Sequence, residues 1–246
     1  MSYLELKNVK KSFGAINALQ GVDFQIGAGE AVGLMGDNGA GKSTLVKIIA
    51  GNVQPTSGQI FVDGEDTVFA SPLDARKLGI EIVYQDLALC DNLTAAANVF
   101  LGRELLAGFG QFHKLSHAAM NRRAAELFDE LKSETRPNDL VEQMSGGQRQ
   151  AVALARTRLS DPKLVLLDEP TAAISVRQVA EVLARIAQLR DTGHAVILVS
   201  HRMGDVFEVC DRVAVLRRGR KIADKPIGDS SLEEVTGLIT GALEEA

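Results

Sequence analysis

The chain has 246 residues, 46% of them hydrophobic, which is enough for one large α/β domain or two small ones with a buried core. Its formal net charge of −5 provides no general field that attracts DNA or RNA, which argues against a nucleic-acid partner. The two cysteines, Cys90 and Cys210, lack metal-binding or redox spacing, so we expect reduced thiols in a cytoplasmic protein.

The N-terminal residues alternate between polar and apolar side chains and lack the apolar stretch of a secretory leader. No apolar run reaches the roughly 18 residues that a membrane-spanning helix needs. We therefore expect any role at a membrane to be peripheral.

The first third of the chain is predicted to form a sheet, because short alternating apolar runs are separated by Gly, Asn, Asp and Pro. The predicted strands are 3–9, 22–26, 31–34 and 59–62. One helix is expected between them, from about Lys42. A further strand is expected at 80–84.

From about residue 86 to residue 160 the pattern becomes helical, with Ala, Leu, Arg and Glu at helical spacing in 118–131 and 148–159. Strongly apolar runs follow at 164–167 and 195–199, each short and followed by a helical pattern, as is typical of central parallel strands. A strand at 212–217 and a helix from about Ser231 complete the prediction. The fold class is α/β.

A complete phosphate-binding P-loop follows the predicted strand 31–34. Its glycines let successive backbone N–H groups point inward, and the N-terminus of the next helix attracts the same anion. Lys42 is predicted to reach the terminal phosphates of a nucleotide, and Ser43 to place its hydroxyl on Mg²⁺. The nucleotide-binding residues are predicted to be Gly36, Asp37, Asn38, Gly39, Ala40, Gly41, Lys42, Ser43 and Thr44.

Two acidic residues, Asp168 and Glu169, stand at the carboxyl end of the apolar run 164–167, where open α/β sheets bind ligands. Adjacent residues of a strand point to opposite sides, so the two carboxylates are expected to differ in role. Asp168 fits the group that holds Mg²⁺, and Glu169 fits the group that orients or deprotonates the attacking water.

Ser145 and Gln148 form a capping-box pattern that opens a helix. Gly146 and Gly147 in the first turn each cost about 1 kcal/mol relative to alanine, which indicates a close approach of the backbone to another group. A capped helix is one interpretation. A helix N-terminus that binds a phosphate is the other.

The segment Ser145-Gly146-Gly147-Gln148 resembles the signature motif of ABC ATPases, and its order between the P-loop and Asp168-Glu169 extends the resemblance to essentially the whole chain. The resemblance implies a single ABC nucleotide-binding domain over 1–246. It implies a mainly parallel core sheet with an N-terminal antiparallel β portion, formed by about 1–85 and 161–246, and an inserted helical subdomain over about 86–160. The implied cofactors are ATP and Mg²⁺.

The resemblance also assigns roles to single residues. Gln85 is the Q-loop glutamine that contacts Mg²⁺ or the attacking water, and His201 is the switch histidine that contacts the γ-phosphate. Phe13 matches the aromatic residue that stacks on adenine, although a single Phe here could equally be a core residue. The other histidines, His113, His117 and His194, are expected to be surface residues.

In this family two nucleotide-binding domains close head to tail, so the signature of one chain faces the P-loop nucleotide of the other. The resemblance therefore implies an ATP-dependent dimer with a second copy of the chain, with the binding residues of each site coming from both copies. Many members have Asp where this chain has Ser175, in the loop that communicates across the dimer.

Shorter runs, at 98–104, 171–175 and 199–202, are similar to sugar-uptake ATPases. Ribose-type members commonly carry two such domains in tandem and others append a regulatory domain, so this chain resembles the single-domain carbohydrate importers of bacteria. The implied function is an ATPase that energises import of a monosaccharide. The alternatives are an exporter ATPase and a soluble ABC protein of DNA repair or translation.

The implied partners are integral membrane permease subunits, with a periplasmic sugar-binding protein acting indirectly and with no nucleic acid. The implied location is peripheral, on the cytoplasmic face of the cell membrane. The segment 85–104 is expected to dock the permease. Its apolar residues either receive a short permease helix or belong to the core; they are Leu87, Leu89, Leu93 and Phe100.

Overall fold

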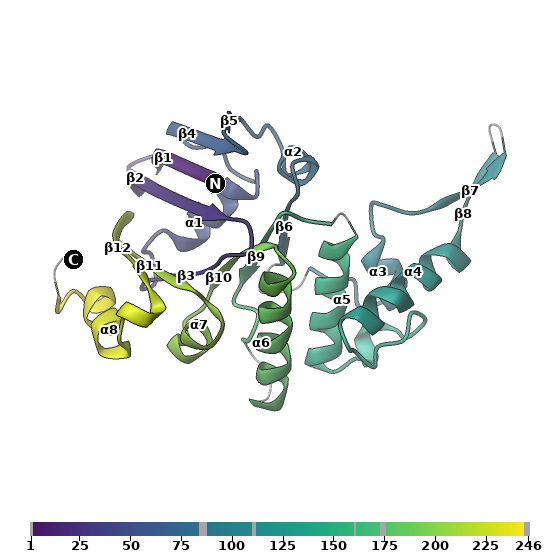
Figure 1. Cartoon of the computed structure of the whole chain (residues 1–246). Helices are drawn as coiled ribbons and strands as arrows, with labels where there is room; N and C mark the ends of the chain where they lie inside the picture. Colours follow the sequence, from purple (N-terminus) through teal and green to yellow (C-terminus); the bar gives the residue numbers. More distant parts are fainter. Residues whose placement is uncertain (1, 84–87, 110–111, 160, 173–175, 244–246) are drawn as a thin grey trace. The chain divides into compact units, whose positions relative to one another are not determined.

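The computed structural model describes residues 2–83, 88–109, 112–159, 161–172 and 176–243. The chain divides into two compact units. The first comprises Met1–Ile82, Pro162–Pro170 and Leu183–Ala246, and the second comprises Val83–Asp161 and Thr171–Val182. The first unit carries the antiparallel sheet and most of the large sheet, and the second is mainly helical (Figure 1).

The large sheet has the strand order β12-β11-β3-β10-β9-β6. Strand β10 pairs in parallel with β3 and β9, and β11 pairs in parallel with β3, so the predicted parallel core is confirmed. Every residue of β3 and β10 is buried, which explains their unbroken apolar sequences. The bounds are β3 Ala31–Met35, β6 Ile80–Val83, β9 Leu164–Asp168, β10 Ala195–Val199, β11 Arg212–Arg217 and β12 Arg220–Pro226.

A second sheet has the strand order β2-β1-β4-β5 and is antiparallel throughout. This confirms the predicted antiparallel portion near the N-terminus. Its buried face joins β3, β9, β10 and α1 in one apolar core. The bounds are β1 Ser2–Phe13, β2 Ile16–Gly27, β4 Ser57–Val62 and β5 Glu65–Asp66.

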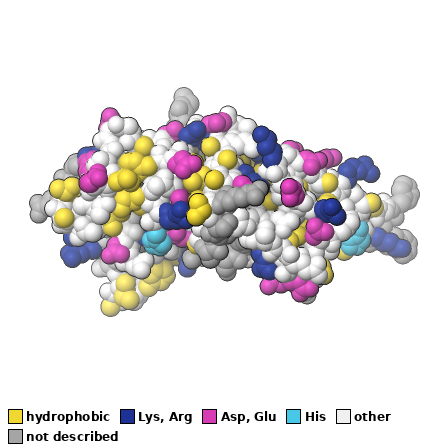
Figure 2. All heavy atoms as spheres, turned by 90° about the horizontal axis from the view of Figure 1, so that it is seen from below, with side chains coloured by type: hydrophobic (Ala, Val, Ile, Leu, Met, Phe, Trp, Pro, Cys, Tyr) yellow, Lys and Arg dark blue, Asp and Glu magenta, His cyan; other side chains and the backbone are white. Residues whose placement is uncertain are grey.

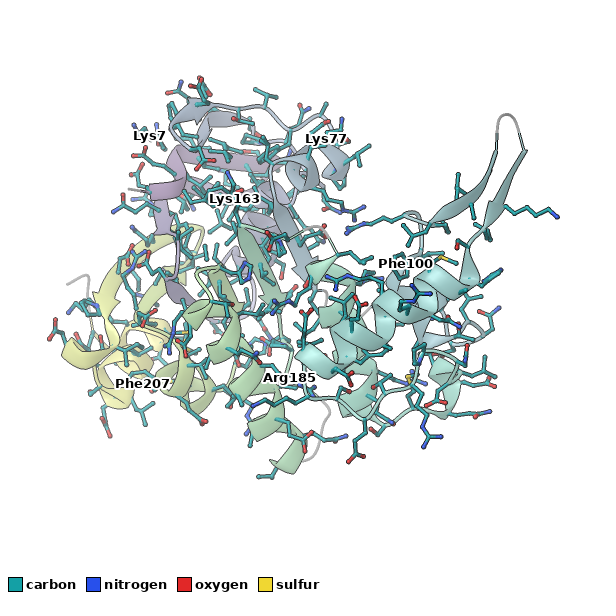
Figure 3. All side chains as sticks on the ribbon, turned by 45° about the vertical axis from the view of Figure 1, so that its right-hand side comes forward. Lys7, Lys77, Phe100, Lys163, Arg185 and Phe207 are labelled. Atoms are coloured by element: carbon teal, nitrogen blue, oxygen red, sulfur yellow. The ribbon has the colours of Figure 1, made fainter. Side chains whose placement is uncertain are left out.

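Tyr3 connects this sheet to the segment between α2 and β6. Its hydroxyl donates to the carbonyl of Leu78 at 2.5 Å, and burial raises the pKa of Tyr3. Lys163, labelled in Figure 3, lies 5.6 Å from the Tyr3 ring centroid and pairs with Asp63 at 2.7 Å. The start of β9 is thereby fixed against β1.

The helices expected after the P-loop and at the C-terminal end are present. Ser231 caps the last helix by accepting from the amide of Glu234. The helical pattern expected after 195–199 is present as the short α7. The short α2 and the strand β12 escaped prediction, because six or seven residues hold too few turns or alternations for a clear period. The bounds are α1 Lys42–Ile49, α2 Pro72–Lys77, α6 Val176–Asp191, α7 Met203–Val209 and α8 Leu232–Thr240, where α6 contributes to both units.

In the second unit α3 packs against α4 and α5, and the start of α6 also belongs to this unit. The predicted helices at 118–131 and 148–159 are confirmed as α4 and α5. The hairpin of β7 and β8 was not predicted, because its ten residues mix small, aromatic and basic side chains without regular alternation. The bounds are α3 Ala95–Val99, α4 His117–Glu130, α5 Gly146–Arg158, β7 Leu106–Phe109 and β8 Phe112–Leu115.

The surface drawn in Figure 2 carries acidic and basic side chains interspersed with one another. This distribution agrees with the modest net charge of −5. Among the described residues, the helices are all too short or too polar to cross a bilayer.

Gly33 allows α7 to pack directly on β3. A Cβ atom at Gly33 would lie 2.2 Å from Cγ1 of the fully buried Val206. We expect Gly33→Ala to lower the free energy of unfolding by about 1–3 kcal/mol through overpacking, measured by urea denaturation. Adding Val206→Ala removes the clashing methyl groups, so the double variant should be less destabilised than the sum of the two single variants.

The control is Gly204→Ala in the same helix, where a Cβ atom meets nothing within 4 Å. This variant should be neutral or slightly stabilising. Strict additivity of Gly33→Ala and Val206→Ala would contradict the packing argument.

Candidate functional site

The predicted phosphate-handling residues of the first unit gather at one edge of the large sheet. Strands β3, β10 and β9 are adjacent and parallel, so their carboxyl ends meet at this edge. β3 leads into the P-loop, β9 ends in Asp168, and β10 leads into Ser200 and His201. The structure therefore brings together residues that are more than 150 positions apart in the sequence.

The P-loop backbone requires glycine at two positions. Gly36 has φ +148°, and a Cβ atom there would lie 2.2 Å from the carbonyl oxygen of Leu216. Gly41 has φ +107°, and a Cβ atom there would lie 2.8 Å from the carbonyl oxygen of Ala18. At both positions the backbone has a positive φ and another backbone segment of the same chain lies close by, so only glycine fits without strain.

Lys42 is buried at the start of α1 with 7% of its surface exposed. Its ammonium donates to the carbonyl oxygens of Gly36 at 2.6 Å and Asp37 at 3.0 Å. Burial lowers the pKa of Lys42, and the nearby carboxylates of Glu169, Asp37 and Asp168 oppose that shift. Next to it, Ser43 is exposed, so its hydroxyl can accept a ligand.

Glu169 stands at the end of β9 in an unusual backbone conformation. Its φ is +53°, which a glutamate rarely adopts and which costs about 1–3 kcal/mol. Its amide donates to the carbonyl of Val199 at 2.9 Å, and its Oε2 accepts from the amide of His201 at 3.3 Å. The side chain is thus held beside His201 by contacts with the end of β10.

The other carboxylate oxygen of Glu169, Oε1, lies 3.1 Å from Nε2 of His201. This oxygen is buried, and no donor of the described residues is aligned to hydrogen-bond to it. A buried acceptor without a hydrogen bond suits a bound water or ligand.

The two carboxyl groups share a low-dielectric environment. Burial raises the pKa of Glu169. The charge of His201 and the hydrogen bond from the His201 backbone amide act in the opposite direction and lower that pKa. Burial also raises the pKa of Asp168, and the cations Lys42, Lys47 and His201 oppose it. Cations on α1 and after β10 therefore keep both acids closer to their ionised forms than burial alone would allow.

The donor set at this edge fits Mg²⁺. Asp168 offers a carboxylate and Ser43 a hydroxyl, both hard oxygen ligands. The described residues form no cluster of three or more acidic, His or Cys side chains that would cage a metal alone. Mg²⁺ commonly takes only one or two protein ligands and completes its shell with phosphates and water, so the residues present suffice.

Phe13 ends β1 with 49% of its surface exposed. Lys11 places its ammonium 5.0 Å from the ring centroid. The interpretation of Phe13 as a core residue is therefore wrong, and its ring is available to a ligand.

The segment 145–148 belongs to the second unit. The capping box is present, since the Ser145 hydroxyl accepts from the amide of Gln148 at 3.3 Å and Gln148 Oε1 accepts from the amide of Ser145 at 3.0 Å. A Cβ atom at Gly147 would lie 3.2 Å from the side chain of Gln178. The glycines predicted a close approach of the backbone to another group. At Gly147 that group is α6 of the same chain.

Two predicted residues, Gln85 and Ser175, lie outside the described residues. The expectation for His194 is wrong: it is buried, with Nδ1 2.5 Å from the carbonyl oxygen of Pro162. His117 is exposed as expected, and the side chain of His113 is not described.

Two polar side chains with positional roles were not predicted. Ser200 is 1% exposed and its hydroxyl accepts from the amide of Arg202 at 3.0 Å, which shapes the turn that carries His201. Asn98 is fully buried in the second unit and makes four hydrogen bonds. The sequence signal for Asn98 is a polar residue within the apolar stretch 95–100.

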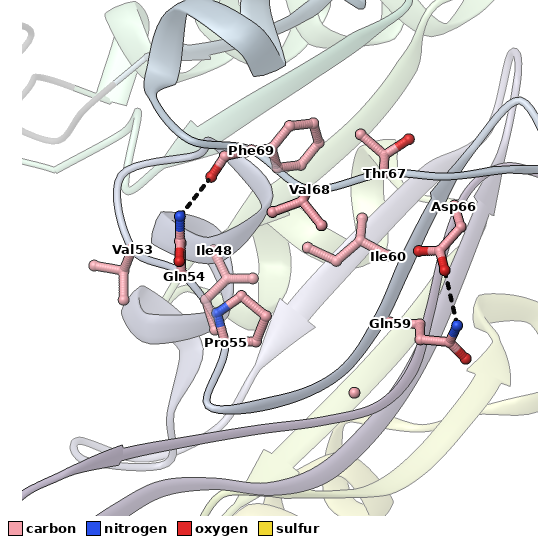
Figure 4. Close-up of a pocket in the computed structure, with 11 residues that line it drawn as sticks. Ile48, Val53, Gln54, Pro55, Gln59, Ile60, Asp66, Thr67, Val68 and Phe69 are labelled. Atoms are coloured by element: carbon pink, nitrogen blue, oxygen red, sulfur yellow. Dashed lines mark hydrogen bonds between the residues drawn. The ribbon is translucent and has the colours of Figure 1, made fainter.

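A small pocket lies beside β4, away from the P-loop (Figure 4). Its volume of about 50 Å³ is far below the roughly 300 Å³ of a small-molecule site. Inside it Gln59 donates to Asp66 at 2.9 Å. We assign this pocket no ligand. Its lining residues are Ile48, Val53, Gln54, Pro55, Gly58, Gln59, Ile60, Asp66, Thr67, Val68 and Phe69.

The electrostatics predict a titration that can be observed directly. Because burial raises the pKa of Glu169 above its ordinary value of 4.5 and His201 lowers it, we expect His201→Gln to raise that pKa further. The measurement is a carbon-13 titration of the Glu169 carboxyl by NMR. His117→Gln, at an exposed position, is the control and should leave the midpoint unchanged. A fall of the Glu169 midpoint in His201→Gln would contradict the electrostatic assignment.

Comparison with known proteins identifies the family to which the chain is similar. The family model described as ABC transporter matches residues 19–172. The chain is 44% identical over 238 residues to the xylose/arabinose import ATP-binding protein of Sulfolobus acidocaldarius, covering 96% of this chain and 93% of that protein. It is 42% identical to the fructose import ATP-binding protein of Rhizobium meliloti, covering 98% and 95%.

The ribose import ATP-binding protein of Yersinia pestis is 39% identical over 97% of this chain. This chain spans 46% of that protein, about half its length.

Solved structures share the fold. A nucleotide-free ATP-binding cassette from an ABC transporter superposes with a TM-score of 0.84 at 23% identity, covering 98% of this chain and 96% of that one. A dimeric cassette in a post-hydrolysis state with ADP and phosphate superposes with a TM-score of 0.77 at 30% identity, covering 91% and 98%. The predicted ABC-type ATPase fold is therefore confirmed. By sequence and by fold, this chain belongs to the ABC transporter family.

Proposed function

We propose that this chain is the ATP-hydrolysing subunit of an importer for a monosaccharide. The observation that carries the proposal is the match over nearly the full length of two relatives named as sugar import ATP-binding proteins. The phosphate-handling edge of the large sheet supplies the chemistry, since a P-loop, the buried Glu169, the half-buried Asp168 and a histidine meet there. Neither alternative, an exporter ATPase or a soluble ABC protein of repair or translation, is favoured by a specific observation.

ATP binds along the P-loop in this proposal. Lys42 exchanges its bonds to the carbonyls of Gly36 and Asp37 for bonds to the terminal phosphates. Phe13 stacks on the adenine, which its exposed ring supports. Ser43 and Asp168 hold Mg²⁺, and the ion supplies charge neutralisation on the phosphate oxygens.

Glu169 acts on the attacking water. Its buried Oε1 lacks an aligned donor within the described chain and is the acceptor to which that water would donate. A pKa raised by burial makes the carboxylate a better proton acceptor. Proton transfer to such a positioned base contributes about 10²- to 10⁴-fold to the rate. His201 lies beside this carboxylate and contacts the γ-phosphate.

A second copy of the chain completes each site. Ser145, Gly146, Gly147 and Gln148 of that copy bind the nucleotide held by the P-loop of the first, with the helix N-terminus of α5 directed at the phosphates. The capping box fixes the first turn of α5 for this contact. The dimeric solved relative with ADP and phosphate supports such an assembly. Gln85 contacts Mg²⁺ or the water.

The partner at the membrane is a permease, which docks on residues 85–104. Of the apolar residues in this segment, Phe100 is 2% exposed and belongs to the core of the second unit, whereas Leu89 and Leu93 are half-buried. Leu87 lies outside the described residues. The chain is placed peripherally on the cytoplasmic face of the membrane, with a periplasmic sugar-binding protein acting through the permease.

The test is ATP hydrolysis by the membrane complex purified through a tag on this chain. We expect a polytopic permease to copurify, and xylose, arabinose, fructose or ribose with its binding protein to raise ATPase activity. A complex that hydrolyses ATP but responds to none of these sugars would contradict import of a monosaccharide.

Glu169→Gln in the same complex tests the chemistry separately. This variant should bind ATP with unchanged affinity and lose at least about 10²-fold in kcat, because the general base is absent. Glu65→Gln, in the exposed strand β5, is the matched control and should retain full activity. Substantial turnover by Glu169→Gln would refute the assignment of the base.

A further inference from the structure

The loop at residues 88–94, which directly follows the undescribed residues 84–87, is joined to the segment that leads into Ser145. Backbone amides make the connection within the second unit: Glu142 donates to the carbonyl of Asp91 at 3.1 Å, and Val141 donates to that of Leu93 at 3.1 Å. A further bridge pairs Thr94 with Leu140. Three residues after Val141 the chain reaches Met144 and then the cap of α5.

Two backbone contacts continue this connection at the start of α3. Ala95 donates to the carbonyl of Asp139 at 2.9 Å, and Ala96 donates to that of Pro137 at 2.9 Å. The loop 88–94 with the start of α3 is therefore joined to the segment 137–142 by several backbone hydrogen bonds, which form a small junction. A displacement of one segment would be passed to the other through these bonds.

The side chain of Asn98 fixes the conformation of the loop 88–94 through hydrogen bonds. Its side chain has no exposed surface, and its Oδ1 accepts from the amide of Cys90 at 2.7 Å. Its Nδ2 donates to the carbonyls of Cys90 at 3.0 Å, Thr94 at 3.1 Å and Leu93 at 3.4 Å. The carbonyl of Leu93 also accepts from Val141, so one oxygen joins the Asn98 side chain to the segment before the signature.

Side chains of α5 reach the same loop. Arg149, one residue after Gln148, pairs with Asp91 at 3.0 Å, and Arg156 donates to the carbonyl of Ala88 at 2.9 Å. The loop is thus attached both to the chain before the signature motif and to the helix after it. Charge pairs as exposed as Asp91–Arg149 contribute little stability, so the buried Asn98 is the stronger determinant of the loop conformation.

We propose that Asn98 is a positioning residue that couples the 88–94 loop to the signature motif at Ser145. This proposal rests on the proposed function, in which the permease docks on residues 85–104. A shift of the docked loop moves the carbonyls of Asp91 and Leu93, and the amides of Glu142 and Val141 follow. The first turn of α5 then moves with its capping box toward or away from the nucleotide of the second copy.

Asn98→Asp removes both donors of Nδ2 and places an acceptor oxygen against three carbonyls. In the full chain we expect hydrogen exchange to accelerate about tenfold in peptides covering 90–94 and 140–145, as loss of roughly one or two hydrogen bonds predicts. Peptides of α4 should be unchanged. In the membrane complex, sugar should no longer stimulate ATPase activity, while the basal KM for ATP stays within about twofold, because the P-loop is untouched.

The matched control is Asn121→Asp on α4, a half-buried asparagine whose Nδ2 donates a hydrogen bond to Asn138 at 2.8 Å. It should alter neither readout. Asn98→Ala replaces Asn98→Asp if the latter does not fold, and it should show the same pattern of exchange.

Three results would overturn the proposal: faster exchange at 90–94 without any change at 140–145, retained stimulation by sugar, or proportional loss of basal and stimulated activity together. If the wild-type complex itself shows no stimulation by sugar, the proposed function fails. The exchange measurement on the isolated chain still decides whether Asn98 joins the two segments.

Discussion

Burial of opposite charges at one edge of the parallel sheet is the constraint on which the rest of the site depends. Lys42 and Glu169 are 7% and 8% exposed, and an unpaired charge at such a depth costs several kcal/mol. The ammonium of Lys42 therefore stays with the carbonyls of Gly36 and Asp37, near the two carboxyl groups. A triphosphate brings negative charge that replaces these partners. The glycines at positions 36 and 41 are required because their neighbours leave no room for a Cβ atom.

The same arrangement costs the protein stability. Burial raises the pKa of Glu169 above the 4.5 of an unfolded glutamate, so the folded state binds the proton more tightly. The stability that the folded state gains from protonated Glu169 is fully present below the ordinary pKa of 4.5. It is lost as the pH rises through the pKa of Glu169 in the folded state. The backbone of Glu169, at φ +53°, adds strain. The fully buried strands β3 and β10 offset both costs, and the strained residue sits where the chemistry requires it.

The sequence predicted those parts of the molecule whose physics is local. The P-loop, the buried strands 164–167 and 195–199 and the helices α4 and α5 follow from glycine placement and apolar periodicity, and the structure has them. Individual side-chain contacts were beyond reach: nothing in the pattern indicates that Asn98 bonds Cys90, or that His194 turns inward to Pro162. Phe13 was left open for the same reason, because exposure depends on what packs over the end of β1. Short elements such as α2 and β12 carry too few residues for a period.

The central claim is that the P-loop edge is one half of a site and that Ser145 of a second copy provides the other half. The most direct measurement mixes two inactive variants, Lys42→Ala and Ser145→Arg, and follows ATP hydrolysis. A mixed dimer holds one site in which an intact P-loop faces an intact signature, whereas each variant alone holds none. The account predicts that the mixture hydrolyses ATP well above either variant alone. A mixture as inactive as its components, or full activity of Ser145→Arg by itself, would contradict it.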